Sequence, residues 1–161
     1  MKEKAIKIWS RTEEIFNKYE RKLMSASFVF GFLWDNLTLT RIDLWLDNLI
    51  LFSYLTTAGL GIALSNIGMG KVRESVVGRI SIWAPLIMQF AFGGLFSSFI
   101  VFYSRSSSIG ASWPFLLFLT VMFVGNEFFK KHYQRFGFQM SILFTAIFSF
   151  SIFYVPLIAH R

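Results

Sequence analysis

The chain has 161 residues, of which 55% are hydrophobic and 21 are phenylalanine, and this exceeds the apolar content that a soluble domain of this length can bury. Its formal net charge is +7, but the cations stand in short connectors between apolar runs, which indicates membrane topology and not a nucleic-acid groove. The absence of cysteine excludes disulfides, thiolate metal sites and cysteine nucleophiles. We therefore expect an all-α integral membrane protein, with a bundle of five transmembrane helices preceded by an N-terminal amphipathic interfacial helix.

Residues 1–23 are predicted to form a cytoplasmic amphipathic helix. Apolar side chains recur there at helical spacing, among seven Lys or Arg and four Glu. A helix of this kind lies at the headgroup level of a bilayer, buries its apolar stripe and offers its cations to anionic lipid. Anionic lipid is therefore its expected partner, and a protein partner is the alternative. The apolar positions are Ala5, Ile8, Trp9, Ile15, Phe16, Tyr19 and Leu23.

Residues 24–161 are predicted to form the transmembrane domain. Five apolar segments follow one another there, and each is near the ~20 residues that a helix needs to cross ~30 Å of hydrocarbon. Helices are expected because a bilayer offers no water to the backbone, and because the apolar runs are too continuous for barrel strands. The segments cover about residues 24–39, 42–64, 80–103, 113–129 and 138–159, the first and fourth being short.

The distribution of Lys and Arg predicts the orientation of the chain. The six segments outside the spans hold 7, 1, 3, 1, 3 and 1 of these residues in chain order, so 13 fall on one side and 3 on the other. Cytoplasmic connectors carry the excess of Lys and Arg in membrane proteins. We therefore expect the N-terminus in the cytoplasm and the C-terminus on the extracytoplasmic side.

Small residues recur every four positions in two of the predicted spans. Such stripes let helix backbones approach closely, and in lipid this contact replaces the missing hydrophobic drive for association. We interpret them as helix-packing seams, and a polar lining for a solute path is the alternative. One stripe is Ser53, Thr57, Gly61 and Ser65, the other is Gly137, Ser141, Thr145 and Ser149, and the third span adds Gly93 with Ser97 and Gly94 with Ser98.

Several polar residues lie close together between positions 31 and 52. Thr40 and Asp43 fit a T-x-x-D capping box at the start of the second span, where the helix macrodipole favours a carboxylate. Asp35 is expected in the last turns of the first span, where the dipole opposes its charge, and it needs a cation. We predict a charge-paired clasp at the outer ends of the first three spans. Its members are Asp35, Asn36, Arg41, Asp43, Asp47, Asn48 and Arg105.

Two alternatives to the clasp are open from the sequence. Carboxylates beneath a membrane surface also mark substrate or ion pathways, and Asp43 with Asp47 has the ligand chemistry to share a hard divalent cation. The clasp predicts that replacing Arg41 or Arg105 with alanine destabilises the folded bundle. A transport site predicts instead that Asp47→Asn abolishes flux and leaves thermal stability nearly unchanged.

The cytoplasmic side carries a predicted ion pair but no catalytic constellation. Glu127 precedes Lys131 by four residues, the favourable order for an ion pair within one helix. Neither His132 nor His160 has a metal-ligand partner at a recognisable spacing. The chain has no nucleophile elbow, phosphate loop or dinucleotide fingerprint. We therefore expect no enzymatic activity, no cofactor and no metal.

Three stretches of the chain carry a resemblance to a known family. GFLWDNLTLTRIDLWLDN, FGGLFSSFIVFYSRSSSIGASWPF and VGNEFFKKHYQR are similar to the membrane half of a family of uncharacterised bacterial multi-pass inner-membrane proteins, which often carry a C-terminal domain of unknown function. The resemblance covers most of residues 28–158 and includes no catalytic motif. It implies a multi-pass protein of the bacterial inner membrane.

The expected function is that of a non-enzymatic module that anchors or assembles membrane partners, a second copy of the chain among them. A small solute or ion transporter with an outer-side carboxylate site is the alternative. Transporters typically show inverted repeats with helices broken near the midplane. The three prolines stand instead near span ends, at Pro85, Pro114 and Pro156, and this favours the anchoring or assembly module.

Overall fold

The computed structural model describes residues 2–39, 45–66, 83–107 and 113–153. These ranges contain five α-helices and no strand, so the prediction of an all-α chain is confirmed. The helices are α1 (Lys2–Thr38), α2 (Trp45–Asn66), α4 (Ala84–Ser107), α5 (Trp113–His132) and α6 (Gly137–Phe153).

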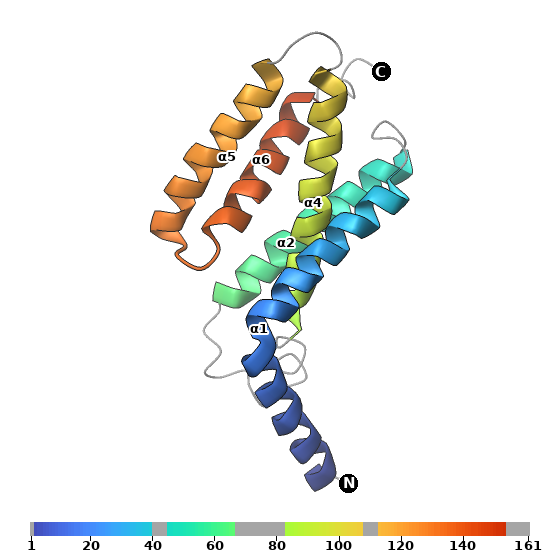
Figure 1. The fold of residues 1–161 in the computed structure, drawn as a ribbon, viewed down its shortest axis with the longest axis vertical. Helices are drawn as coiled ribbons and strands as arrows, with labels where there is room; N and C mark the ends of the chain where they lie inside the picture. The colour runs from blue at the N-terminus through green and yellow to red at the C-terminus, as the bar shows by residue number, and fades with distance from the viewer. Residues whose placement is uncertain (1, 40–44, 67–82, 108–112, 154–161) are drawn as a thin grey trace.

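The helices run alternately up and down the long axis of the molecule (Figure 1). α1 ends and α2 begins at one end of the bundle, where α4 also ends and α5 begins; we call it the α1–α2 end. The opposite end holds the N-terminus, the end of α2, the start of α4 and the turn between α5 and α6. Because the segments richest in Lys and Arg adjoin this opposite end, we call it the basic end.

α1 joins the predicted interfacial helix and the first predicted span in one element. It is a single helix of 37 residues, with no break at the expected boundary between residues 23 and 24. Neither glycine nor proline occurs from residue 2 to residue 30, so nothing in the local sequence ends the helix. Figure 1 shows α1 changing direction along its length, and its N-terminal half extends past the rest of the bundle at the basic end.

Two helices are long and apolar enough to cross a membrane, over Trp45–Leu64 in α2 and Ala84–Val101 in α4. Gly137–Ser149 in α6 is apolar but shorter. In the described ranges, length and composition thus give two candidate spans, and the predicted five-span bundle is not confirmed. The apolar half of α1 contains the polar residues Asp35 and Asn36, which lower its hydropathy.

The bundle has two parts with α4 at the centre. α1 and α2 pack along α4, and its side chains Met88, Phe92 and Leu95 are completely buried. α5 and α6 pair mainly with each other and contact α4 less extensively (Figure 1). We refer to these parts as the three-helix unit (α1, α2 and α4) and the α5–α6 hairpin.

Phe96 of α4 connects the two parts. Its ring centroid lies 5.9 Å from that of Phe28 in α1 and 6.2 Å from that of Phe138 in α6. Aromatic pairs at such separations contribute about 0.5–1.5 kcal/mol beyond the area that they bury. A single side chain of the central helix thus touches both parts of the bundle.

A glycine determines the tight turn between α5 and α6. α5 ends with the basic residues Lys130, Lys131 and His132, which complement the negative end of the helix macrodipole. α6 begins at Gly137, where an added Cβ would lie 2.6 Å from the Cα of Lys130. Only a residue without a side chain allows the start of α6 to lie this close to α5.

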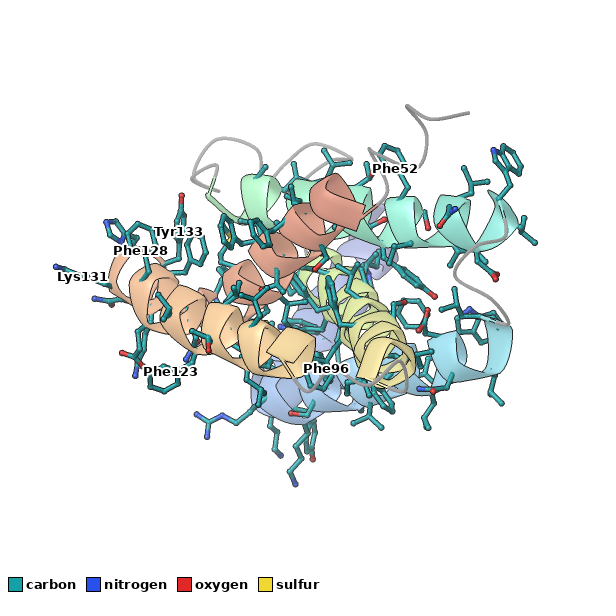
Figure 2. All side chains as sticks on the ribbon, turned by 90° about the horizontal axis from the view of Figure 1, so that it is seen from above. Phe52, Phe96, Phe123, Phe128, Lys131 and Tyr133 are labelled. Carbon is teal, nitrogen blue, oxygen red and sulfur yellow. The ribbon has the colours of Figure 1, made fainter. Side chains whose placement is uncertain are left out.

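The outside of the bundle is also apolar. Phe52 of α2 and Phe123 and Phe128 of α5 are exposed, and Figure 2 shows them pointing away from the bundle. In the apolar window of α2, Trp45–Leu64, only 28% is buried inside the molecule. Soluble monomers rarely expose apolar patches of more than a few hundred Å², so this surface is unusual for a protein surrounded by water.

Candidate functional site

α1 and α4 cross at two glycines. A Cβ added at Gly31 would overlap the backbone carbonyl of Phe90, and one added at Gly93 would overlap that of Phe28. The two helix backbones are therefore in direct contact, as small residues permit. The four-residue spacing from Ser97 makes Gly93 recognisable in the sequence, whereas Gly31 is a lone glycine in an apolar run and forms no periodic pattern.

This crossing places Asp35 of α1 against α4. The Asp35 side chain is 0% exposed. The Ser98 hydroxyl donates to its carboxylate, with Oγ at 3.1 Å from Oδ1 and 3.0 Å from Oδ2, and Ser97 is also within hydrogen-bonding reach. Hydroxyl groups therefore hold this carboxylate, and the described part of the chain provides it with no cationic partner.

Asn36 completes the polar contact between α1 and α4. Its Nδ2 donates to Ser97 Oγ at 2.7 Å and to the carbonyl of Phe32 at 2.9 Å. Because Ser97 Oγ accepts this bond, its own proton remains available for Asp35. The spacing of Gly93 and Ser97 explains the arrangement, since the glycine brings the backbones together and the serine one turn later meets the polar end of α1.

α2 contributes Tyr54 and Asp47 to the same site. The Tyr54 ring packs on Gly94, where an added Cβ would lie 2.7 Å from the ring. Tyr54 is 7% exposed, and its hydroxyl lies within hydrogen-bonding reach of Thr38 of α1. Asp47 is 3% exposed, and Asp35 lies within electrostatic range of both groups. We call this cluster the three-helix junction; its members are Asp35, Asp47, Tyr54, Ser97 and Ser98.

Two effects disfavour an ionised carboxylate at Asp35. It lies near the C-terminus of α1, where the negative end of the macrodipole disfavours an anion. Its burial also removes it from water, which is costly for an ionised group. Hydrogen bonds to charged groups contribute about 1.5–3 kcal/mol each, so the serine hydroxyls offset part of this cost. Asp47 adds a second acidic group nearby.

Four members of the predicted clasp lie in the described ranges. Asp35 and Asp47 are buried at the three-helix junction, and Asn36 bonds to Ser97 although its side chain is largely exposed. Asn48 is half-buried, and its Oδ1 is buried without a hydrogen-bond partner among the described residues. The structure thus brings together Asp35, Asp47 and Asn36.

The other three members lie outside the described residues. Arg41 and Asp43 fall between α1 and α2, beyond the ranges that the structure describes, as does the predicted capping box. Arg105 belongs to α4, but its side chain is not among those described. The pairing of the aspartates with arginine therefore stays a prediction. The structure shows serine hydroxyls and Tyr54 near Asp35, and no sequence pattern connects these residues with the carboxylates.

The small-residue stripe of α6 lies on a buried face. Gly137, Ser141, Thr145 and Ser149 are all buried. An added Cβ at Gly125 of α5 would lie 3.1 Å from Ser141 Cβ, and Thr145 Oγ1 lies 3.3 Å from Met122 Sδ of α5. This stripe therefore contacts α5 closely.

The stripe of α2 lies only partly on a contact face. Gly61 is buried against Met88, Thr57 is half-buried, and Ser53 is exposed and bonds to the Ile50 carbonyl of its own helix. The side chain of Ser65 lies outside those described. Four residues turn an α-helix about 40° more than one full turn, so such a stripe rotates away from a single contact. The buried face of α2 consists of Asp47, Tyr54, Ala58, Gly61 and Ile62.

At the basic end, an ion pair in the described ranges joins α1 to the turn between α5 and α6. Arg135, in the turn after α5, pairs with Glu20 of α1. Glu127 and Lys131 are both exposed on α5, and no ion pair joins them in the described part of the chain. Long exposed side chains gain little from holding one geometry, which accounts for the separation of Glu127 from Lys131.

No group of three or more His, Cys, Asp or Glu side chains is placed to hold a metal ion in the ranges that the structure describes. Comparisons with protein-family models, with curated proteins and with solved structures return no match to this chain. The resemblance to bacterial inner-membrane proteins therefore stays a prediction from the sequence. What the structure itself defines is an all-α bundle with two candidate membrane spans and a buried acidic junction.

Proposed function

We propose that this chain is a multi-pass membrane protein with five spans. The observation that carries the proposal is the exposure of α2. Its window Trp45–Leu64 has the length and hydropathy of a span, yet only 28% of it is buried inside the molecule. The apolar core helix of a soluble protein is covered by its neighbours. A helix that is apolar and largely uncovered requires an apolar solvent, which a lipid bilayer provides.

The path of the chain supports an orientation with the N-terminus in the cytoplasm. The alternating helices bring the start of α1 and the α5–α6 turn to the basic end, and 13 of the 16 Lys and Arg belong to segments that adjoin this end. The positive-inside rule then assigns the basic end to the cytoplasm and the α1–α2 end to the extracytoplasmic side. This orientation is the one expected for the bacterial inner membrane.

Within this framework we infer a non-enzymatic role in anchoring or assembling partners. The N-terminal half of α1 extends beyond the bundle and exposes Ile15, Tyr19 and Leu23 at helical spacing. Lys18 lies 5.6 Å from the centroid of the Tyr19 ring, so cations flank this apolar stripe. Such a surface fits anionic lipid at the cytoplasmic interface. A membrane-protein partner or a second copy of the chain is expected along the apolar outer faces.

A small solute or ion transporter is the alternative, and it would use the carboxylates as a transport site. Asp35 and Asp47 are 0% and 3% exposed, and Gly31 and Gly93 hold α1 directly against α4 beside them. A solute path requires access from one side at a time. The closed packing around the two carboxylates supports the anchoring role over transport.

Single introduced cysteines test the membrane insertion and the orientation of the protein. No native cysteine has to be replaced first, because the chain has none. Ser107→Cys, at the last residue of α4, should react with an impermeant maleimide on intact cells, whereas Gln134→Cys, in the α5–α6 turn, should react only after permeabilisation. Labelling of both variants in permeabilised membranes is the control. The reverse pattern contradicts the orientation, and extraction of the protein by alkaline carbonate contradicts membrane integration.

The anchoring role is tested separately from the topology. Vesicles containing anionic lipid and the purified protein should hold Na⁺ and proton gradients as long as protein-free vesicles do. A reporter fused to the N-terminus should remain with the membranes. Leak of either ion that disappears in Asp35→Asn would show transport and would overturn the anchoring role.

A further inference from the structure

The exposed face of α5 changes from apolar to basic within one helical turn. Phe123 and Phe128 are 71% and 58% exposed, and Lys130 and Lys131 follow them and are also exposed. Lys131 comes three residues after Phe128, so these two side chains are neighbours on one face of the helix. Figure 2 shows Phe128, Lys131 and Tyr133 pointing outward at one edge of the molecule. This face of α5 therefore combines an apolar surface with cations at its end.

The dimensions of this face match one leaflet of a bilayer. Lys131 follows Phe123 by eight residues, which corresponds to about 12 Å along the helix axis. Half of the ~30 Å hydrocarbon core is about 15 Å. With the lysines at the headgroup level, Phe123 therefore lies among the acyl chains. One lipid molecule is long enough to contact both the lysines and the apolar part of the face.

The backbone that carries the two lysines is held in place by contacts with the rest of the bundle. An added Cβ at Gly137 would lie 2.6 Å from the Cα of Lys130, so the start of α6 packs directly on the end of α5. In the turn between them, Arg135 pairs with Glu20 of α1, and Phe136 is buried in the core. A site whose backbone is already fixed loses less conformational freedom when a ligand binds.

We propose that the C-terminal end of α5 binds one anionic phospholipid of the cytoplasmic leaflet, with its phosphate at Lys130 and Lys131 and an acyl chain along Phe128 and Phe123. Charge complementarity selects the headgroup, because cations at the cytoplasmic surface attract anionic lipid. The adjoining apolar surface selects a lipid over a free anion, which has no hydrocarbon to bury. α5 contains one acidic residue, Glu127, against its two lysines, so the end of the helix keeps a positive charge.

This site is separate from the lipid surface proposed for the N-terminal half of α1. That surface is a stripe along a helix that extends beyond the bundle, whereas the α5 site is a compact pair of cations beside a packed turn. The α5 site rests on the proposed membrane placement and orientation, since both put the end of α5 at the cytoplasmic leaflet. It does not rest on how the N-terminal half of α1 interacts with the membrane.

The proposal is tested by native mass spectrometry of the full chain in a neutral detergent, titrated with phosphatidylglycerol. One molecule per chain should bind at a saturable site that phosphatidylcholine with the same acyl chains does not occupy. The double variant Lys130→Gln and Lys131→Gln should raise the lipid concentration for half-occupancy by roughly 30-fold, and Lys130→Arg with Lys131→Arg should retain binding. The control is Arg21→Gln with Lys22→Gln, which removes two adjacent exposed cations from α1 and should leave half-occupancy within about threefold of the wild type.

Three results would overturn the proposal. The first is equal binding of phosphatidylglycerol and phosphatidylcholine, which would leave no role for the cations. The second is a loss of binding in the α1 control as large as in the α5 double variant, which would place the lipid on α1. The third is displacement of the lipid by glycerol phosphate at similar concentrations, which would assign the site to a free anion. The cysteine-labelling test is independent of these results, so a failure of the proposed orientation is distinguished from a failure of the lipid site.

Discussion

The α1–α4 crossing in the three-helix unit and the α5–α6 contact at Gly125 in the hairpin use glycine in different ways. In the three-helix unit, Gly31 and Gly93 face the backbone carbonyls of the opposite helix. In the hairpin, Gly125 faces the Cβ of Ser141, 3.1 Å from an added Cβ. A side chain can shift by a few tenths of an ångström, whereas two backbones can separate only if the helices move apart. Glycines at helix contacts therefore differ in how well they tolerate substitution by a larger residue.

The two parts differ also in how their polar groups are satisfied. Thr145 in the hairpin donates to the carbonyl of Ser141 in its own helix at 2.7 Å. Asp35 depends on Ser97 and Ser98 of α4 and lies near groups of α2. Across the hairpin, Thr145 makes only a weak contact to the Met122 sulfur of α5 at 3.3 Å, whereas the three-helix unit links a carboxylate and an amide of α1 to serine hydroxyls of α4.

The largest expected effect lies at the glycine crossing. Gly93→Ala should lower the free energy of unfolding by about 3 kcal/mol or more, because its Cβ overlaps the backbone of α1 and the helices must separate. Denaturant titration in detergent, followed by circular dichroism, measures the change. Gly59→Ala is the matched control, since no atom lies within 4 Å of its added Cβ. It should be neutral or stabilise by up to about 1 kcal/mol. Equal effects at both positions would show that the crossing is not tight.

The next largest effect is expected for the Ser98 hydroxyl, which donates to the Asp35 carboxylate. Ser98→Ala should lower the free energy of unfolding by about 2 kcal/mol, because it leaves a buried carboxylate with one donor fewer. The effect should shrink in an Asp35→Asn background, and a double-mutant cycle measures this coupling. Ser53→Ala is the control, since Ser53 is exposed and bonds within its own helix. Additive effects of Ser98→Ala and Asp35→Asn would argue against the polar link between α1 and α4.

The hairpin should respond less strongly to the equivalent change. Gly125→Ala brings a Cβ to 3.1 Å from Ser141 Cβ, and a small shift of that side chain relieves the contact. We expect a loss of about 1 kcal/mol, measured in the same denaturant titration as Gly93→Ala. A loss as large as that of Gly93→Ala would remove the distinction between the two parts.

The smallest effect is expected for the ion pair that joins the two parts at the basic end. Arg135 and Glu20 are 66% and 33% exposed, and exposed pairs contribute about 0–1 kcal/mol. Glu20→Gln should therefore lower the free energy of unfolding by less than about 1 kcal/mol, and less at high salt. Glu127→Gln, where no ion pair is found in the described residues, is the matched control. A loss of several kcal/mol for Glu20→Gln alone would mean that this contact holds the hairpin in place.

The sequence by itself determined the local properties of the protein. Hydropathy and helical periodicity predicted helices near residues 42–64, 80–103, 113–129 and 138–159, and each helix of the structure beyond α1 begins within a few residues of one of them. The predicted end of the last span, residues 154–159, lies outside the described residues. The clustering of Asp35, Asn36 and Asp47 near one end of the bundle also followed from their sequence positions. These features could be predicted because they depend on short-range spacing along one chain segment.

The tertiary structure alone decided which groups meet. Asp35 meets Ser98, which is 63 residues away, and Glu20 meets Arg135, which is 115 residues away. The α6 stripe is buried throughout, while Ser53 of the α2 stripe faces outward. The rotation of a helix about its own axis and its crossing point with a neighbour set these contacts, and periodicity within one helix determines neither. Gly31 shows this most directly, because only the backbone of α4 beside it reveals why no side chain fits there.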